Sequence, residues 1–468
     1  MARILLGKLV LSWCDRCHTP VLGKKCSCGA ETRPVSVTPP GDIRPAFRSD
    51  IDHINSLYEA QFGEKLIPDG HIVILNKIPD ADRMEEVIMG GSVVCAYRYI
   101  PAEKRWELLP RIHAFEYAEP RRKYVVVDDG AVESIKAGSS LLAPGLVEIE
   151  DSVKVDDEVF ILSSSGECIG VGRARVSAED ARKMTNGAVI KTRKPKPTVF
   201  VKGEATWDDA IRSNSVILDN MESESIAFVK SVVAKNPNLP VNVSYSGGKD
   251  SLATLLIVQK ALGKTPIVFS DTTLEFPETY QNVADVVTKY GLEIIRTGAG
   301  DTFWEAFEVE GPPAVDCRWC CSVCKLMPVK KLIEERWGQC LSFIGQRKYE
   351  SLARLKSPRV WRNHKVQIQL SAAPIQHWTA LHVFLYLFRE KAPYNVLYER
   401  RIDRIGCFMC PSSDHATFEI IKRDYPDLWK MWQEKLGYWM KKNNLPEEWR
   451  TNAQWRQRGG EDDTSSYT

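Results

Sequence analysis

The stretch Val241-Asn-Val-Ser-Tyr-Ser-Gly-Gly-Lys-Asp-Ser251 decides the fold of the largest part of this chain. It begins as a buried strand, turns at two glycines and continues into an apolar helical segment, Leu252 to Leu262. Glycines let backbone N–H groups approach an anion, and the positive end of the helix dipole adds to the attraction. The spacing is not that of a Walker A loop. We expect a phosphate cradle, with Lys249 as a charged catalytic candidate, made of Ser246, Gly247, Gly248, Lys249, Asp250 and Ser251.

Alternating strands and helices surround this cradle. Each predicted strand is separated from the next by enough residues for a helical crossover, which indicates a parallel sheet. The strands are predicted at Val241 to Tyr245, Ile267 to Ser270, Leu292 to Arg296 and Leu341 to Ile344. An apolar stripe also predicts a helix from Trp207 to Lys235, packed on the sheet.

Charged residues follow two of these strands, where the carboxyl ends of parallel strands meet. Asp271 could bind a ribose or a magnesium ion, and capping of its own loop explains it equally well. Arg347, Lys348 and Arg354 follow the fourth strand, and guanidinium groups suit phosphate or sulfate oxygens. The alternative for these three is a solvated basic loop.

Two pairs of cysteines lie in the same region. Cys320 and Cys321 are adjacent, and Cys407 and Cys410 follow far downstream as Cys-x-x-Cys. Adjacent thiolates splay too widely to share one tetrahedral ion comfortably, whereas they can reach two irons of a cubane. The four cysteines therefore predict a [4Fe-4S] cluster and not a zinc ion.

The motifs between about Val241 and Pro411 resemble the adenylyl-sulfate and phosphoadenylyl-sulfate (PAPS) reductase branch of the PP-loop ATP-pyrophosphatase superfamily. The resemblance is carried by the Ser246 to Ser251 loop, Asp271-Thr-Thr-Leu-Glu-Phe-Pro-Glu-Thr-Tyr280, Cys320-Cys321 with Lys325 and Pro328, Arg347 with Ser351, Pro374-Ile-Gln-His-Trp-Thr379, Pro393-Tyr-Asn-Val-Leu-Tyr398 and Ile405-Gly-Cys-Phe-Met-Cys-Pro411. It implies an α/β domain of the adenine nucleotide alpha hydrolase-like type. It also implies a nucleotide at the carboxyl ends of the parallel sheet, with the cluster near the phosphosulfate.

In these reductases a cysteine near the C-terminus attacks the sulfonyl sulfur, and a dithiol protein then releases sulfite. This sequence has no cysteine after Cys410, and its polar tail, 459–468, is predicted to be disordered. Cys317 and Cys324 are therefore candidates for the nucleophile, because neighbouring basic residues favour the thiolate. The alternative is that both are spare ligands. Cys340 is predicted to be a buried structural thiol.

Four further cysteines stand near the N-terminus, as Cys14-x-x-Cys17 and Cys26-x-Cys28. This spacing is typical of a small ribbon held by a structural zinc ion, and the alternative is free surface thiols. The apolar stretch from Ile4 to Trp13 is expected to form the first ribbon strand, since it is too short to span a bilayer.

Residues from Arg121 to about Arg193 resemble a PUA domain, a β-barrel best known from RNA-modifying enzymes. The matching residues are Tyr124-Val-Val-Val-Asp128, Gly138-Ser-Ser-Leu-Leu-Ala-Pro-Gly145, Asp156-Asp-Glu-Val159 and Gly170-Val-Gly-Arg-Ala174. Residues 41–120 resemble the accessory domain that precedes PUA in archaeal tRNA-modifying proteins. The resemblance implies an RNA partner such as tRNA.

Composition requires any RNA surface to be local, because the formal net charge is only +2. The basic runs Lys191 to Lys196 and Arg121 to Lys123 are candidates, and the alternative for both is a solvated linker. Thirteen cysteines, grouped largely as metal pairs, fit a reducing cytoplasm better than a disulfide framework.

A chain of 468 residues is too long for one hydrophobic core, which predicts a multidomain protein that combines an α/β PP-loop domain, a β-barrel and a small zinc ribbon. The expected order is zinc ribbon 1–40, pre-PUA-like accessory domain 41–120, PUA domain 121–198, helical linker 199–236, PP-loop domain with the iron–sulfur site 237–458, and disordered tail 459–468. The oligomeric state stays open.

Two functions fit these features. The favoured one is an iron–sulfur reductase that converts PAPS or adenylyl sulfate to sulfite with a dithiol or ferredoxin-type electron donor. The alternative is an RNA sulfur transferase, in which the same loop binds ATP with Mg²⁺ and a base is adenylated before it accepts sulfur. Ligation of the cluster by four cysteines favours the first function, whereas the PUA unit and the missing nucleophile favour the second. A third hypothesis, an RNA-binding protein with a relic PP-loop domain, conflicts with so complete a set of motifs.

Overall fold

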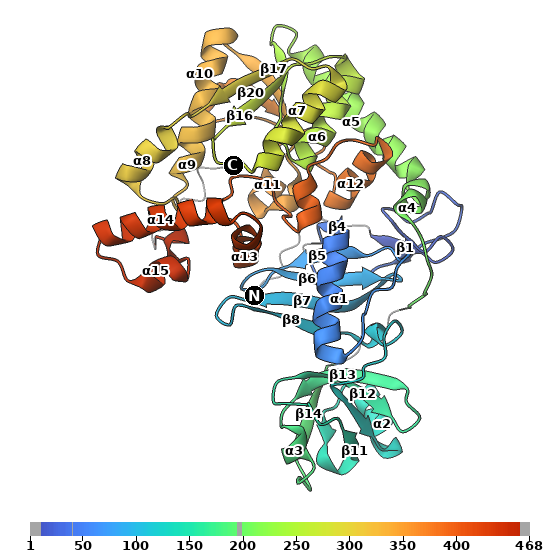
Figure 1. Ribbon diagram of the computed structural model, residues 1–468. Coiled ribbons are helices and arrows are strands. Elements are labelled where there is room, and N and C mark those ends of the chain that lie inside the picture. The colour runs from blue at the N-terminus through green and yellow to red at the C-terminus, as the bar shows by residue number, and fades with distance from the viewer. Residues whose placement is uncertain (1–10, 40, 194–198, 459–468) are drawn as a thin grey trace. The chain divides into compact units, whose positions relative to one another are not determined.

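The computed structural model describes residues 11–39, 41–193 and 199–458 and divides into two compact units (Figure 1). One unit ends at Asn214, and the other begins at Ser215. The predicted strand from Ile4 to Trp13 lies mostly outside the described residues, and so do the predicted tail 459–468 and the end of the run Lys191 to Lys196. None of the described helices has the length and apolarity needed to cross a membrane.

The unit that begins at Ser215 is built on a sheet whose described strands lie in the order β17-β16-β15-β18-β20-β19. All pairs are parallel except that of β19 with β20. The strands are β15 (Val241–Ser244), β16 (Ile267–Asp271), β17 (Ile294–Gly298), β18 (Cys340–Ile344), β19 (Val360–Asn363) and β20 (Val366–Ala372). The four predicted strands are confirmed, and the third lies two residues further along the chain. The sequence prediction lacks β19 and β20, because polar residues interrupt their apolar pattern.

Helices form the crossovers between the parallel strands, as the alternation predicts. Helix α6 connects β15 with β16 and packs against α5 and α12. The helices of this unit are α5 (Ser215–Lys235), α6 (Lys249–Leu262), α7 (Pro277–Tyr290), α8 (Thr302–Glu310), α9 (Trp319–Cys321), α10 (Met327–Arg336), α11 (Leu352–Lys356), α12 (Ala380–Arg389), α13 (His415–Asp424), α14 (Pro426–Lys442) and α15 (Glu447–Thr451). A π-helical turn, Ser322–Leu326, joins α9 to α10.

The predicted helix from Trp207 to Lys235 is interrupted at Asn214, between α4 (Trp207–Ser213) and α5. The Asn214 side chain accepts a hydrogen bond from the Leu22 N–H at 2.8 Å and donates one to the Pro20 carbonyl at 2.8 Å. These contacts with a distant segment outweigh the helical periodicity, and the break coincides with the division between the two units.

The unit that ends at Asn214 contains three sheets among its described residues. The smallest has the order β2-β1-β3, with β1 (Ser12–Cys14), β2 (Thr19–Val21) and β3 (Arg33–Pro34). The second is an antiparallel meander of β4 (Ile43–Pro45), β5 (Ile74–Ile78), β6 (Met84–Met89), β7 (Ser92–Ile100) and β8 (Arg105–Pro110). Helix α1 (Arg48–Phe62) packs on it through Ile54, Tyr58 and Phe62, which are fully buried.

The third sheet has the order β10-β14-β13-β12-β9-β11 and a separate apolar core. Its elements are β9 (Tyr124–Val127), α2 (Asp129–Lys136), β10 (Leu141–Leu142), β11 (Leu146–Ile149), β12 (Glu158–Ser163), β13 (Cys168–Ala174), α3 (Ala178–Ala181) and β14 (Ala188–Arg193). Strands β9 and β12 pair in parallel, and the other pairs are antiparallel. In the short strand β10, Leu141 is buried whereas Leu142 is 52% exposed.

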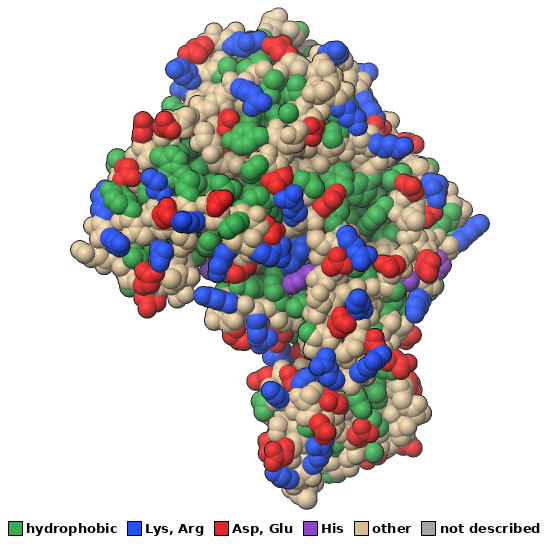
Figure 2. Space-filling view, in the orientation of Figure 1, with side chains coloured by type: hydrophobic (Ala, Val, Ile, Leu, Met, Phe, Trp, Pro, Cys, Tyr) green, Lys and Arg blue, Asp and Glu red, His purple; other side chains and the backbone are tan. Residues whose placement is uncertain are grey.

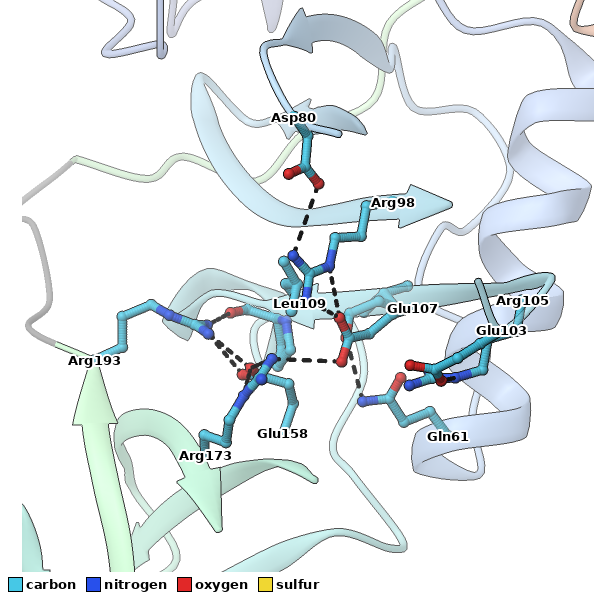
Figure 3. Close-up of polar contacts among 12 residues, drawn as sticks. Gln61, Asp80, Arg98, Glu103, Arg105, Glu107, Leu109, Glu158, Arg173 and Arg193 are labelled. Atoms are coloured by element: carbon cyan, nitrogen blue, oxygen red, sulfur yellow. Dashed lines mark hydrogen bonds and ion pairs between the residues drawn. The ribbon is translucent and has the colours of Figure 1, made fainter. Parts of the chain in front are cut away.

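An ionic network joins the second and third sheets (Figure 3). Glu158, whose side chain is 1% exposed, accepts hydrogen bonds from Arg193 at 2.8 Å and Arg173 at 3.1 Å. Arg173 also reaches Glu107 of β8 at 3.4 Å, and Glu107 binds Arg98 at 2.7 Å. The network thus joins the meander to the PUA-like sheet.

The variant Glu158→Gln is expected to lower the free energy of unfolding by about 1.5–3 kcal/mol, because two arginines lose a buried anionic partner. Urea denaturation of the full chain measures the effect. The matched control is Glu103→Gln, since Glu103 and Arg105 form an exposed pair whose loss costs less than about 1 kcal/mol. Equal effects of the two variants would contradict the prediction.

Candidate nucleotide and metal site

The glycine loop lies between the carboxyl end of β15 and the first turn of α6. Gly247 has a φ of +75°, which favours glycine, and a Cβ there would lie 2.7 Å from Cγ2 of Thr279. Ser251 ties the loop together, because its hydroxyl donates to the Gly248 carbonyl at 2.8 Å and accepts from the Ser246 N–H at 3.2 Å. The loop is therefore a tight, preformed turn.

Two backbone groups of this loop are available to a ligand. Among the described residues, no hydrogen bond engages the N–H groups of Gly247 and Gly248. The next N–H, that of Lys249, donates to the Tyr398 hydroxyl at 2.9 Å, and Asn395 donates to the Gly247 carbonyl at 3.3 Å. The loop thus presents two N–H donors beside the N-terminus of a helix, which suits an anion.

The charged residues of the loop are paired with one another. Lys249 contacts one oxygen of the Asp250 carboxylate at 2.9 Å, and Nε of Arg347 contacts the other at 2.7 Å. Burial alone would raise the pKa of Asp250, but Arg347 and Lys249 hold it below its ordinary value. The sequence treats Lys249 and Arg347 as independent charges for phosphate, whereas in the structure they share Asp250 as a partner.

Two further residues that the sequence predicts to bind the nucleotide also have partners in the protein. Arg354 forms an ion pair with Glu350 one helical turn earlier. Asp271 accepts from the Thr273 N–H at 2.9 Å and from the Tyr280 hydroxyl at 2.8 Å. Asp271 therefore caps its own loop, which is one of the two roles that its position in the sequence allows.

The structure brings the two distant cysteine pairs together. Cys407 pairs with Glu275, just after β16, and the Phe408 N–H donates to the Leu274 carbonyl at 2.9 Å. The thiol of Cys320 interacts with Cys321, Cys407 and Cys410, and its hydrogen bond with Cys321 contributes most to raising its pKa. The same hydrogen bond, with Arg318 and Lys325, lowers the pKa of Cys321 to about 5.

The four cysteines of this site could together hold a metal centre, and their thiols are less tightly grouped than a second set in the chain. In the part of the chain that the structure describes, the four thiols whose Sγ atoms all lie within 4.8 Å of one another are Cys14, Cys17, Cys26 and Cys28. Cys320, Cys321, Cys407 and Cys410 are neighbours but do not form so tight a group. A wider arrangement of four thiolates is what an iron–sulfur cubane requires.

The remaining cysteines of this unit differ in accessibility. Cys324 is 2% exposed, and burial raises the pKa of its thiol to about 12, which opposes a nucleophilic role. Cys340 is fully buried in β18 and its thiol contacts the Ser342 hydroxyl at 3.6 Å, as expected for a structural thiol. Cys317 is partly exposed. Its loop is attached to the C-terminal segment, because the Val315 N–H donates a hydrogen bond to the Arg456 carbonyl at 2.7 Å.

Comparison with known proteins assigns two parts of this chain to known domain families. The profile of the phosphoadenosine phosphosulfate reductase domain matches residues 240–413, and the PUA domain profile matches residues 123–195. The chain is 41% identical to an uncharacterized protein of Methanocaldococcus jannaschii over 96% of this chain and 97% of that protein. The chain belongs to the phosphoadenosine phosphosulfate reductase family.

Two further matches are to proteins named as reductases, one found by sequence and one by structure. An adenosine 5′-phosphosulfate reductase of Geobacillus kaustophilus is 28% identical over 36% of this chain and 72% of that enzyme. The phosphoadenylyl-sulfate reductase of Candida auris, solved as a phosphate complex, is 20% identical and covers 41% of this chain and 95% of its own, with a TM-score of 0.33.

Several residues that surround the glycine loop are not predicted by the local sequence to belong to the site. Three residues far downstream in the sequence lie against the loop, so only the fold brings them there: Gly345, Asn395 and Tyr398. Tyr398 and Asn395 lie in a motif that marks the family, which could have suggested a role. Gly345 follows a predicted strand, and nothing local distinguishes it from other turn glycines.

Low pH is expected to destabilise the reductase-family domain through His382, at the start of α12. Burial and the charge of Arg347 lower the pKa of His382 to about 3. Because the unfolded chain takes up this proton near pH 6.5, the stability contributed by neutral His382 is complete above pH 6.5 and is lost as the pH falls toward 3, by up to about 1.4 kcal/mol per unit.

Urea denaturation between pH 7 and 5 measures this slope. His382→Gln is expected to flatten it, whereas His364→Gln, at an exposed position of the same unit, leaves it unchanged. An unchanged slope in the His382 variant would assign the acid sensitivity to other groups.

Proposed function

We propose that this protein is an iron–sulfur sulfonucleotide reductase-like enzyme that reduces the phosphosulfate of PAPS or adenylyl sulfate to sulfite. One juxtaposition carries the proposal. The glycine loop leaves the carboxyl end of β15, and the segment that pairs with Cys407 leaves the carboxyl end of β16, the adjacent parallel strand. A nucleotide in the loop would therefore lie beside the four thiols.

The loop residues would hold the phosphate next to the reacting sulfur. The N–H groups of Gly247 and Gly248 supply donors, and the buried group of Lys249, Asp250 and Arg347 keeps the loop in place. The remaining loop residues Ser246 and Ser251 fix its turn by mutual hydrogen bonds.

Cys320, Cys321, Cys407 and Cys410 would hold the [4Fe-4S] cluster. When bound, the cluster would adjust the electrostatic potential around the phosphosulfate. Arg318 donates to the Cys321 sulfur at 3.4 Å, and the Thr272 hydroxyl lies 3.5 Å from the Cys407 sulfur, so these residues would orient the thiolates.

Cys317 is our candidate for the nucleophile, because its thiol is partly exposed whereas those of Cys324 and Cys340 are buried. Its thiolate would attack the sulfonyl sulfur, so that an S–S bond forms, the S–O bond to phosphate breaks, and the nucleoside phosphate leaves. One thiolate of a dithiol donor would then attack the Cys317 sulfur and release sulfite. The second donor thiol would resolve the mixed disulfide, so the donor supplies two electrons.

Anaerobic titration calorimetry with adenylyl sulfate, PAPS and ATP, followed by a sulfite assay with a dithiol donor, tests this function. Tight sulfonucleotide binding with sulfite release supports it. Cys317→Ser should keep binding and iron content but lose sulfite release, whereas Cys340→Ser should keep all three. Preference for ATP without any sulfite would overturn the reductase proposal.

A second candidate is an ATP-dependent RNA sulfur transferase, which the PUA match and the basic segment after β18 favour. From Lys348 to Lys365 the chain carries six Lys or Arg residues and one acid, Glu350, whereas the preceding Arg347 is buried against Asp250. The face of the molecule shown in Figure 2 mixes basic and acidic side chains. Mass spectrometry of nucleosides from RNA incubated with the enzyme, Mg²⁺, ATP and a sulfur donor would detect the thiolated base, and its absence would exclude this activity.

A further inference from the structure

The four N-terminal cysteines form a compact donor set that the proposed reaction does not use. Cys14 and Cys17 lie at the turn between β1 and β2, where Cys14 pairs with Thr19. Cys26 and Cys28 lie in a second turn, closed by the bridge between Lys25 and Glu31. In this second turn the Cys26 N–H donates to the Ala30 carbonyl at 3.1 Å, and the Gly29 N–H donates to the Cys26 carbonyl at 2.9 Å.

The spacing of the sulfur atoms matches a tetrahedral ion. The Sγ atoms of Cys14 and Cys28 are 3.8 Å apart, and those of Cys17 and Cys26 are 3.9 Å apart. All four lie within 4.8 Å of one another. A zinc ion with Zn–S bonds of about 2.3 Å requires sulfur–sulfur distances of about 3.8 Å. Four sulfur donors complete the coordination, so no position is left for a substrate.

The strands around this group are too short to form a stable core alone. Strands β1 and β2 have three residues each, and β3 has two. Such small folds generally obtain their stability from a bound metal, because metal binding is coupled to folding.

Two other parts of the unit are attached to this small sheet. Ser27 donates from its N–H to the Ser213 carbonyl at 2.9 Å, and the Thr19 hydroxyl lies 2.9 Å from that of Ser213. Together with the contacts of Asn214, these bonds hold the carboxyl end of α4, the last helix before the chain enters the second unit.

The turn between β6 and β7 is the other attached part. Arg33 donates to the Gly90 carbonyl at 2.6 Å and to the Gly91 carbonyl at 3.0 Å, and its Nε binds Asp15 at 2.8 Å. Asp15 lies between Cys14 and Cys17, so the first metal-binding turn positions this arginine. A Cβ on Gly91 would lie 2.7 Å from Trp13, which shows how closely the turn packs on β1.

We propose that Cys14, Cys17, Cys26 and Cys28 bind one zinc ion, and that this ion fastens the carboxyl end of α4 and the β6–β7 turn to the N-terminal sheet. The ion has no part in the reaction proposed above. Removal of the zinc ion should therefore loosen residues 207–214 and 90–91 and leave unchanged the four cysteines that we propose as ligands of iron.

Elemental analysis and zinc X-ray absorption of the full-length wild-type protein test the site directly. The expected result is one zinc per chain with four sulfur ligands at about 2.3 Å. Iron in place of zinc at these residues, or two disulfides detected after alkylation with no zinc, would overturn the proposal.

Hydrogen exchange of the full chain tests the fastening role. Cys26→Ser should lose the zinc and exchange faster at residues 207–214 and 90–91, with its iron content unchanged. Cys168→Ser, at a partly exposed thiol of the same unit outside the group, should keep the zinc and the wild-type exchange. A chelator that removes zinc from the wild type should reproduce the Cys26→Ser pattern, and unchanged exchange after zinc removal would refute the fastening role even if the variant fails to fold.

Discussion

Gly345→Ala is expected to weaken nucleotide binding about tenfold to hundredfold. A Cβ on Gly345 would lie 2.5 Å from the carbonyl carbon of Asp250 and 2.5 Å from the nitrogen of Ser251, and both are backbone atoms of the loop. Strands β15 and β18 are paired neighbours, so the loop cannot move away without disturbing the sheet. Overpacking of this kind costs about 1–3 kcal/mol. If the loop is the part that is distorted, this cost corresponds to a loss of nucleotide affinity of about tenfold to hundredfold.

Calorimetric titration with the nucleotide that binds the wild type measures this effect. Gly437→Ala is the matched control, because a Cβ there meets only Arg450 at 4.0 Å, an ordinary contact. Wild-type affinity in the Gly345 variant would show that the loop tolerates displacement and would remove the reason for regarding it as preformed.

Asp250→Asn is expected to lower the free energy of unfolding by about 3–5 kcal/mol. The variant removes the negative charge between Lys249 and Arg347, whose side chains are 10% and 2% exposed. Removing one partner of a buried ion pair is strongly destabilising, because it leaves buried cations without the carboxylate that balanced their charge.

Urea denaturation of the full chain measures the loss. The double variant Asp250→Asn/Arg347→Gln should be less destabilised than the sum of the two single variants, since it also removes one uncompensated cation. Asp285→Asn, at an exposed position of α7, should change stability by less than about 0.5 kcal/mol. Additive effects at Asp250 and Arg347 would mean that the contact contributes little.

The sequence predicts the local parts of the reductase-family domain well. The strand, the glycine turn and the helix from Val241 onward depend on neighbouring residues, and so does the start of each parallel strand. The meeting of Cys320 with Cys407 follows from the family motifs and not from any local pattern. In the structure it depends on the pairing of Cys407 with Glu275, across the sheet's carboxyl edge.

The features that sequence analysis does not predict depend on contacts between residues that are far apart in the chain. Sequence analysis treats Arg347 as a free cation because its partner Asp250 lies 97 residues earlier in the chain. Sequence analysis treats Asn214 as an ordinary helical residue because its partners, Pro20 and Leu22, lie near the N-terminus, far away in the sequence. Cys324 reads as an activated thiol beside Lys325, whereas packing buries it. In each case the local sequence favours one role for the residue, and a tertiary contact gives it another.

The pairing of Lys249, Asp250 and Arg347 has a consequence for selectivity. A cradle whose fixed charges are balanced internally holds its ligand mainly through the direction of its N–H bonds, so its affinity should respond weakly to ionic strength. It also discriminates little between anions of similar shape. We therefore expect the residues around the loop, and not the loop itself, to decide whether this protein binds a phosphosulfate or a triphosphate.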